Sequence, residues 1–221
     1  MFYQPGVTPH GLAYDPFKSC VVPRPIGWIS TRSKDGIDNL APYSQFTNVS
    51  FDPAMVMFSS NQTTDGRRKD SVVNAEQTGV FVWNMATWDL REHVNLSAEE
   101  LPYGVDEFEH AGLEKADCVN VAASRVSTSP IQFECEYIQT VRLPGNGPMG
   151  TVDVIFGKVV GVHIADGALT NDGKVDVLKL RPIARMGYYE YTSVESKFEM
   201  VIPNSGRLLA GLEGAAAKNK R

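Results

Sequence analysis

Residues 24–71 read RPIGWISTRSKDGIDNLAPYSQFTNVSFDPAMVMFSSNQTTDGRRKDS, and this stretch decides how the rest of the chain is interpreted. Its first eight residues, 24–31, alternate between two faces as a half-buried strand does. Residues 34–38 then predict a turn, because Asp-Gly readily supplies the positive φ angles that a hairpin connection needs. We therefore expect antiparallel strands on either side of this turn.

The next strand-like segment, 41–50, carries many polar side chains. Five amide or hydroxyl residues alternate there with larger apolar residues. A packed strand has little reason to carry so many hydrogen-bonding groups, so this segment is a candidate for the lining of a site. The apolar residues 54–58 predict a buried strand that ends at the polar sequence Ser-Ser-Asn.

A basic loop closes the stretch. Arg67, Arg68 and Lys69 precede residues 70–78, in which a short helix is expected. Free amides at a helix start, the helix macrodipole and adjacent cations together form an anion site. Because the whole chain is acidic, with a formal net charge of −5, the cation cluster indicates a phosphate. A solvated basic loop is the alternative that this segment by itself leaves open.

Three motifs in this order, RPIGWIST, NLAPYSxFTNVSxDP and KDS before a short helix, resemble the flavin reductase-like, FMN-binding split-barrel family. That family includes flavoredoxins and the reductase components of two-component flavin monooxygenases. The resemblance extends over residues 17–191, and its specificity comes from the co-occurrence of all three motifs. The family more commonly has the sequence KDT, with threonine at the position of Ser71. Serine keeps the hydroxyl group that can contact a phosphate.

The resemblance implies a mainly β fold, namely an antiparallel, Greek-key-like FMN-binding split β-barrel with a few peripheral helices. It implies FMN as cofactor, with FAD or riboflavin as alternative flavin substrates, and NADH or NADPH as electron donor. It also implies a homodimer with sites near the subunit interface.

The candidate site residues form three groups on this basis. Phosphate candidates are Ser59, Ser60, Arg67, Arg68, Lys69, Asp70 and Ser71, of which Lys69 and Ser71 match the family motif directly. Ring candidates are Trp28, Ser30, Thr31, Ala41, Pro42, Tyr43, Ser44 and Asn48, with strand packing as the alternative for the first three. Substrate-binding candidates are His163, Arg185 and Tyr189, with plain packing as the alternative. No catalytic side chain or metal ligand is predicted, because the isoalloxazine itself accepts hydride.

The chain divides into an N-terminal arm (1–18), one domain (19–192) and a C-terminal extension with a frayed tail (193–221). With 221 residues and 43% hydrophobic content, it can bury one good core.

Alternation predicts strands at 131–137 and 151–164. In the first, Gln132, Glu134 and Glu136 share one face, and in the second, Val152, Val154, Phe156, Val160 and Val162 share one face. A helix is expected at 87–97, and a loop with a short helix at 99–116 resembles a family excursion over the flavin.

Composition argues against several other classes. The acidic balance does not favour nucleic acid or anionic membrane, and no apolar run approaches the ~20 residues of a membrane span. Without a secretory signal pattern, we expect a cytoplasmic protein. The three cysteines are too few and too separated for a disulfide framework or a zinc site. The GxGxxG sequence at 145–150 runs through Pro148 toward a strand, so it is a turn rather than a dinucleotide fingerprint.

The expected function is that of an NAD(P)H-dependent flavin reductase, which transfers hydride to flavin and supplies reduced flavin to a monooxygenase. A flavoredoxin-like electron carrier without nicotinamide activity, reduced by a ferredoxin-like partner, is one alternative. A cofactor-free dimeric barrel that serves as an interaction module is the other.

Overall fold

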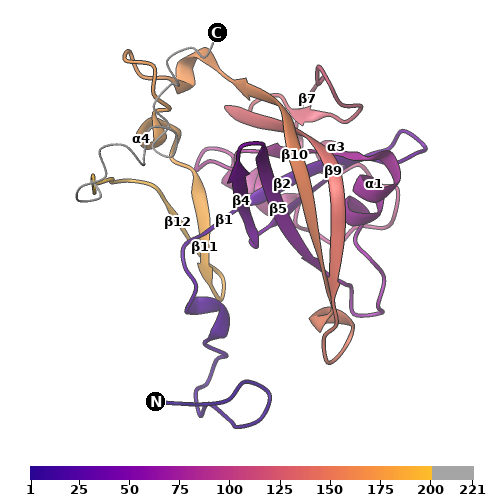
Figure 1. Cartoon of the computed structure of the whole chain (residues 1–221), viewed down its shortest axis with the longest axis vertical. Coiled ribbons are helices and arrows are strands. Elements are labelled where there is room, and N and C mark those ends of the chain that lie inside the picture. The colour runs from indigo at the N-terminus through magenta and orange to yellow at the C-terminus, as the bar shows by residue number, and fades with distance from the viewer. Residues whose placement is uncertain (201–221) are drawn as a thin grey trace.

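Antiparallel strands make up most of the regular secondary structure in this computed structural model, which describes residues 1–200 (Figure 1). The main sheet has the order β3-β2-β6-β9-β10-β5-β4. Its strands are β2 (Gly27–Arg32), β3 (Asp38–Tyr43), β4 (Phe46–Phe51), β5 (Ala54–Asn61), β6 (Val80–Asn84), β9 (Ile131–Leu143) and β10 (Val152–Ile164). The frayed tail expected at the C-terminus lies outside the described residues, as does the rest of the C-terminal extension beyond residue 200.

Two smaller sheets and several short helices complete the described part of the chain. One sheet joins β1 (Arg24–Pro25), β11 (Ile183–Gly187) and β12 (Glu190–Ser193), and the other joins β7 (Lys115–Ala116) and β8 (Arg125–Val126). The α-helices are α1 (Asp70–Thr78), α2 (Arg91–Leu96), α3 (Glu107–His110) and α4 (Val177–Leu180), and single 3₁₀ turns are η1 (Phe17–Ser19), η2 (Pro148–Gly150) and η3 (Asp166–Ala168). None of the helices within residues 1–200 has the length and apolar composition to cross a membrane.

The main sheet curls on itself. Phe46 of the edge strand β4 stacks on Trp83 of β6, with ring centroids 5.3 Å apart and an interplanar angle of 4°. The same Phe46 lies against Gly27 of β2, where a Cβ atom would come within 2.9 Å of its side chain. Strands β2 and β4 lie far apart in the sheet order. These contacts are therefore possible only because the sheet curves until its two ends approach each other. The edge strands β3 and β4 form no ladder with each other in the described residues, so the closure is incomplete.

Two adjacent hairpins replace the single strand expected at 41–50. Strand β2 pairs with β3 around a turn in which Gly36 has φ +83°, as the Asp-Gly pair predicted. Strand β3 then ends at Tyr43, and β4 begins at Phe46 and pairs with β5. Of the five polar residues of this segment, Ser44 and Gln45 lie between the two strands, and Thr47, Asn48 and Ser50 lie on β4, at the edge of the sheet opposite β3.

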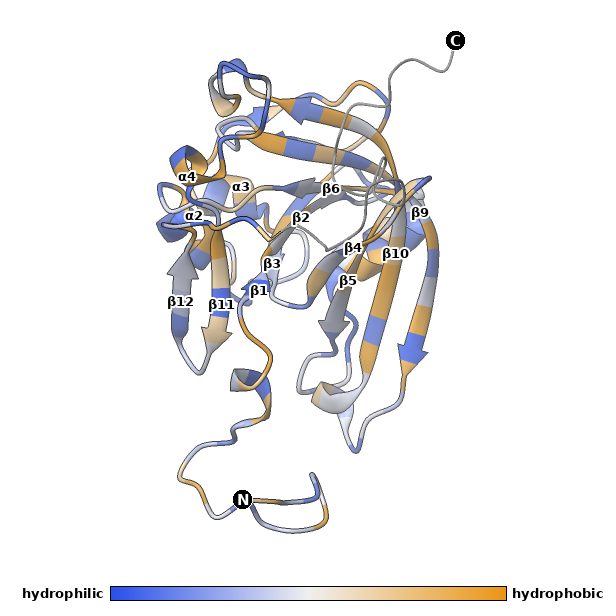
Figure 2. Cartoon of the chain, turned by 60° about the vertical axis from the view of Figure 1, so that its left-hand side comes forward, coloured by the Kyte–Doolittle hydropathy of each residue, from blue (hydrophilic) through white to orange (hydrophobic). Residues whose placement is uncertain are grey.

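The buried face of β10 is the opposite of the one expected from alternation. Asp153, Ile155 and Gly157 are the buried residues of this strand, and Val162 is 54% exposed. A Cβ atom at Gly157 would collide with the Phe81 ring, which packs directly on the strand. Register shifts near Gly157 and Val159 change which side chains face the core. Figure 2 shows the resulting mixture of hydrophobic and hydrophilic residues along β9 and β10.

Helix α2 begins four residues later than expected. Thr87, the predicted cap, forms a β-bridge with Pro182, and the Trp88 amide donates to the Arg181 carbonyl at 2.9 Å. These backbone contacts keep Thr87 and Trp88 out of the helix, and a turn at residues 88–90 precedes its start at Arg91. Strands were correctly predicted at 131–137 and 151–164, and the short helix α3 lies within the predicted excursion at 99–116.

Candidate cofactor site

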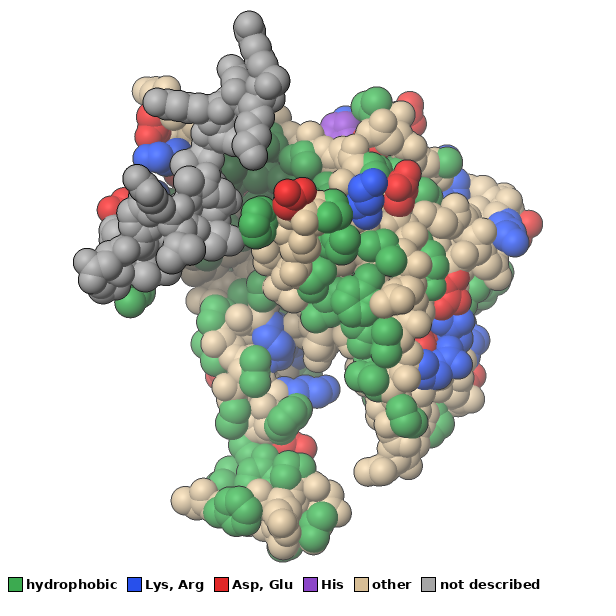
Figure 3. Space-filling model, in the orientation of Figure 1, with side chains coloured by type: hydrophobic (Ala, Val, Ile, Leu, Met, Phe, Trp, Pro, Cys, Tyr) green, Lys and Arg blue, Asp and Glu red, His purple; other side chains and the backbone are tan. Residues whose placement is uncertain are grey.

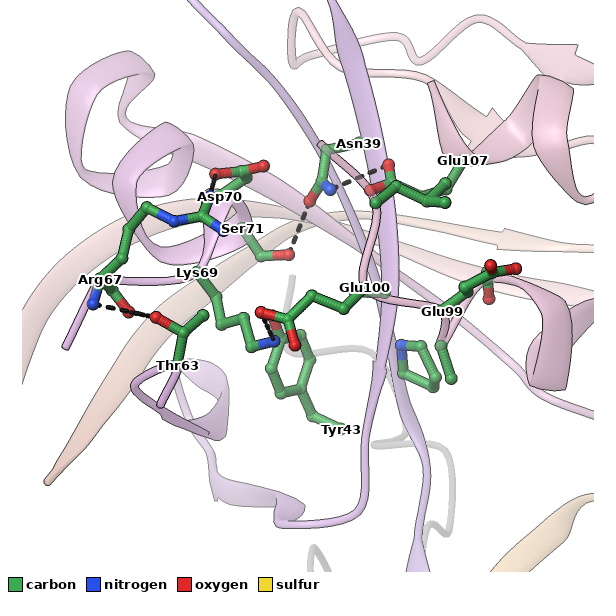
Figure 4. Close-up of a pocket in the computed structure, with 15 residues that line it drawn as sticks. Asn39, Tyr43, Thr63, Arg67, Lys69, Asp70, Ser71, Glu99, Glu100 and Glu107 are labelled. Carbon is green, nitrogen blue, oxygen red and sulfur yellow. Dashed lines mark hydrogen bonds and ion pairs between the residues drawn. The ribbon is translucent and has the colours of Figure 1, made fainter. Parts of the chain in front are cut away.

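A cavity of about 120 Å³ lies where β3, the loop before α1 and the segment after α2 meet (Figure 4). Seven residues predicted from the sequence line it: Ala41, Pro42, Tyr43, Arg67, Lys69, Asp70 and Ser71. Eight further residues complete the lining: Asn39, Thr63, Ser97, Ala98, Glu99, Glu100, Leu101 and Glu107. The structure thus brings together the NLAPYS motif, the KDS motif and the predicted excursion.

The basic side of the cavity is the start of helix α1. The helix is nine residues long, and its N-cap Lys69 makes no side-chain capping hydrogen bond. The first amides of a helix have no intrahelical acceptor, and the macrodipole makes this end positive. Arg67 and Lys69 add two cationic side chains next to these amides. This combination is the chemistry of an anion site.

Most of the acidic lining residues are engaged by neighbours. Glu99 contacts His110 at 2.8 Å, and Glu107 accepts hydrogen bonds from β3. Glu100 lies 3.7 Å from the Lys69 ammonium, and both side chains are partly exposed. An exposed ion pair of this kind stabilises by less than about 1 kcal/mol, so a phosphate dianion can compete for Lys69.

Asn39 links the excursion to the helix start. Its Nδ2 donates to the Glu107 carboxylate at 2.9 Å, and its Oδ1 accepts from the Ser71 hydroxyl at 2.7 Å. The Leu40 amide donates to the same Glu107 oxygen at 3.0 Å. Burial raises the pKa of Glu107, against the effect of these hydrogen bonds. The buried chain of contacts fixes α3 against β3 and orients Ser71 at the cavity.

Two other lining groups have raised pKa values. Burial raises the pKa of Tyr43 to about 12, so its phenol stays protonated. Burial also raises the pKa of Asp70, although Arg67 and Lys69 oppose this effect.

Three predicted ring contacts lie in the core rather than on the cavity. Trp28 and Ser30 have no exposed surface; the Trp28 indole donates to Ser97 Oγ at 2.9 Å, and Ser30 Oγ donates to the Ser124 carbonyl at 2.6 Å. Thr31 is equally buried and donates to Asn39 Oδ1 at 3.3 Å. Strand β2 is covered on both faces. In this structure these three residues therefore pack in the core, which is the alternative to contact with a flavin ring.

Four more predicted residues are outside the cavity lining. Ser44 follows the end of β3, and Asn48 is exposed on β4. Ser59 and Ser60 lie on β5, where the Ser59 amide donates to the Gln45 carbonyl at 2.9 Å and Ser60 is 2% exposed. None of these four residues is among those that line the cavity.

Arg68 points away from its neighbours Arg67 and Lys69. Its guanidinium donates to both Glu76 oxygens at 2.7 and 2.6 Å and to Asp153 at 2.9 Å. Asp153 also accepts from Arg142 Nε at 2.8 Å. This network ties the loop before α1 to β10, so Arg68 supports the cavity without lining it.

The Arg68 network predicts a pH-dependent contribution to stability. The hydrogen bonds from Arg68 lower the pKa of Glu76, despite the opposing effect of burial. A carboxylate whose pKa is lower in the folded state stabilises that state above its unfolded pKa of about 4.3, and this stabilisation is lost as pH falls through the folded pKa. Glu76→Gln should lower the free energy of unfolding by up to about 1 kcal/mol at pH 7, since both groups are partly exposed.

Urea unfolding at pH 7 and pH 3 measures this effect. The difference between Glu76→Gln and the unaltered protein should shrink at pH 3. Glu136→Gln, on the exposed part of β9, is the matched control and should have little effect at either pH. An equal difference at both pH values for Glu76→Gln would contradict the proposed charge interaction.

The three candidate substrate residues lie away from this cavity. His163 contacts the buried Glu134 at 2.5 Å, and Glu134 also accepts from the amides of Val119 and Asn120. Arg185 lies within β11 and donates to the Tyr191 hydroxyl at 2.6 Å. Tyr189, in the turn before a further strand, is 95% exposed and lines a different cavity.

The donor set fits the phosphate end of FMN. Two cations and an uncapped helix start face the cavity, and Thr63 adds a hydroxyl. Sites that enclose a whole cofactor measure about 300–1,000 Å³, so this cavity encloses only part of a flavin nucleotide. Arg67, Lys69 and the α1 amides would hold the phosphate, with Ala41, Pro42 and Tyr43 beside the remainder.

An incompletely closed antiparallel barrel with a cationic helix start defines a split-barrel protein of the flavin reductase type. The chain belongs to the flavin reductase like domain family, which matches residues 19–190. An uncharacterised protein of Aquifex aeolicus is 38% identical over 182 residues, which cover 81% of this chain and 90% of that protein.

Solved structures have the same fold. Nitrilotriacetate monooxygenase component B from Bacillus cereus superposes with a TM-score of 0.82 at 26% identity and covers 90% of this chain and 98% of its own. Flavoredoxin of Desulfovibrio vulgaris (Miyazaki F) superposes with a TM-score of 0.71 at 19% identity, covering 94% of this chain and 100% of its own. The predicted split-barrel family and mainly antiparallel fold are thereby confirmed.

Proposed function

We propose that this protein is an FMN-binding, NAD(P)H-dependent flavin reductase. The observation that carries the proposal is the convergence of Arg67, Lys69 and the start of α1 on one cavity. A flavin bound there supplies the acceptor for hydride. The chain's own task is then to hold the phosphate, position the ring and leave one face open to nicotinamide.

Tyr43 and the Asn39–Glu107 contacts support this role. With a pKa raised to about 12, Tyr43 stays neutral, so it adds no negative charge beside a phosphate ester. The hydrogen bonds of Asn39 to Ser71 and Glu107 fix two walls of the cavity relative to each other. Rigid walls reduce the entropy lost when a ligand is ordered.

Flavin binding and nicotinamide oxidation test the proposal separately. Titration with FMN should quench flavin fluorescence, and NADH or NADPH should then be oxidised in steady state. A protein that takes up no flavin would be an interaction module. One that binds FMN but oxidises neither donor, while a ferredoxin-like protein reduces it rapidly, would be an electron carrier.

A homodimer in the cytoplasm, with a monooxygenase as the acceptor of reduced flavin, completes the proposal. The relative from Bacillus cereus is named as a monooxygenase component, which supports such a partner here. Exposed apolar side chains, including Phe51 at 64% and Met149 at 58%, and the hydrophobic groups gathered on the face in Figure 3 support self-association. Light scattering should give twice the chain mass of 24.3 kDa, and a monomer would contradict this part.

A further inference from the structure

A second cavity, of about 250 Å³, lies between α2 and the hairpin of β11 and β12. It is lined by Trp88, Arg91, Glu92, Val94, Asn95, Ile183, Tyr189, Tyr191 and Thr192. None of these residues lines the candidate cofactor site, so this cavity requires its own explanation.

The walls of the second cavity are fixed to each other by backbone hydrogen bonds. The Trp88 amide donates to the Arg181 carbonyl at 2.9 Å, and the Ile183 amide donates to the Ala86 carbonyl at 3.0 Å. The apolar side chains of Val94 and Ile183 are only 2% and 6% exposed and come from the two opposite walls. The cavity is therefore built into the fold before any ligand arrives.

Aromatic rings and guanidinium groups are combined around this cavity. The Arg91 guanidinium lies 4.3 Å from the centroid of the Trp88 ring, and that of Arg181 lies 4.8 Å from the same ring. The Arg185 guanidinium lies 4.6 Å from the Tyr191 ring. Such distances are those of cation–π contacts, which hold the cations beside the rings.

Part of this positive charge is neutralised. Arg181 pairs with Glu195 at 3.0 Å, and Arg91 lies 3.4 Å from Glu92. No carboxylate lies within ion-pair distance of Arg185 among residues 1–200. Among the residues that line the cavity, Arg91 is the cation and Glu92 the carboxylate. Their side chains are 41% and 74% exposed, so their ion pair is weak and the Arg91 guanidinium can still bind an anion.

We propose that this cavity binds a planar aromatic group that carries an anionic substituent. The Tyr189 ring, which is 95% exposed, offers a flat face for stacking in the same cavity as Trp88, and the Arg91 guanidinium can bind carboxylate or phosphate through paired N–H donors. The ligand is either the adenine nucleotide end of a nicotinamide dinucleotide or a free aromatic acid. The first source rests on the proposed function, and α2 leads directly from this cavity to Ser97–Leu101 of the cofactor site.

Protection of Trp88 from a solvent quencher tests the proposal. Trp88 is 38% exposed, whereas Trp28 and Trp83 are 0% and 9% exposed, so acrylamide reaches Trp88 selectively. AMP or benzoate should protect the Trp88 fluorescence from acrylamide quenching. Each should do so at a concentration at least tenfold lower than its neutral counterpart, which is adenosine for AMP and benzamide for benzoate. Trp88→Phe should remove the signal and so confirm its origin.

The Arg91→Ala variant identifies the anion contact. It should weaken binding of the active probe at least tenfold by calorimetry, whereas Lys34→Ala, in the β2–β3 turn, should bind like the unaltered protein. Binding of AMP alone assigns the cavity to an adenine nucleotide, and binding of benzoate alone assigns it to an aromatic acid. Failure of both probes to bind, or equal binding to Arg91→Ala, would overturn the proposal.

The same variant separates this proposal from the flavin assignment. FMN titration of Arg91→Ala should match the unaltered protein, because Arg91 does not line the cofactor site. If the chain takes up no FMN, the proposed reductase function fails, while the AMP and benzoate titrations still decide the second cavity.

Discussion

Replacement of both Arg67 and Lys69 by alanine is expected to weaken FMN binding by about 3 kcal/mol, or roughly 100-fold. A hydrogen bond to a charged group contributes about 1.5–3 kcal/mol. The lower end of that range applies because the side chains of Arg67 and Lys69 are 47% and 37% exposed. The loss should be smaller at high salt, since exposed charges are screened. Quenching of flavin fluorescence measures the FMN affinity of the double variant and that of the unaltered protein.

Riboflavin separates the loss of the phosphate contact from general damage to the cavity. It lacks the phosphate, so its affinity should be the same in the double variant and in the unaltered protein. Lys34→Ala, which removes one positive charge from a turn residue that does not line the cavity, should leave FMN binding unchanged. The phosphate assignment is wrong if the double variant binds FMN normally, or if riboflavin and FMN weaken by the same factor.

That the consecutive residues of the proposed phosphate site line one cavity could be predicted because they are local in the sequence. Lys69, Asp70 and Ser71 are adjacent in the chain, and the helix that follows them is itself a local structure. The neighbouring Arg68 shows the limit of such reasoning. Its direction is set by Asp153, which lies 85 residues further along the chain. A sequence pattern cannot distinguish it from Arg67 without that partner.

The excursion contributes residues that no local pattern identifies. Glu107 reaches Asn39 across a separation of 68 residues, and the contact exists because α3 packs on β3. Asn39 is the first residue of the NLAPYS motif. Its polar side chain at the start of that motif was the one sequence feature that could have indicated a site residue there. Its partner depends on tertiary packing, which alternation and turn chemistry do not encode.

Alternation also failed at Glu134, for a physical reason that the structure makes clear. The pattern placed Glu134 on a polar, solvent-facing side of β9, but its side chain is fully buried. The loop around Val119 and Asn120 covers it and supplies two amide donors, and His163 supplies a third contact. A carboxylate can be buried when its oxygens are satisfied in this way, and such coverage is not visible in a strand's own sequence.

Trp28→Ala should lower the free energy of unfolding by about 3–5 kcal/mol, the cost of truncating a fully buried aromatic residue. Trp28 has no exposed surface, and its indole donates to Ser97 Oγ at 2.9 Å. Because proteins of this size are stable by about 5–15 kcal/mol, the change removes a large share of the total. Urea unfolding measures it, and Trp88→Ala at a site that is 38% exposed should cost much less.

Trp28→Phe keeps the test informative if the alanine variant does not fold. It retains most of the ring volume and removes the hydrogen bond to Ser97, so the expected loss is about 1 kcal/mol plus a small cavity term. If Trp28 instead contacted the flavin ring, Trp28→Phe would change flavin binding more than stability. The core assignment predicts the reverse, because the Trp28 side chain is fully buried and does not line the cofactor site.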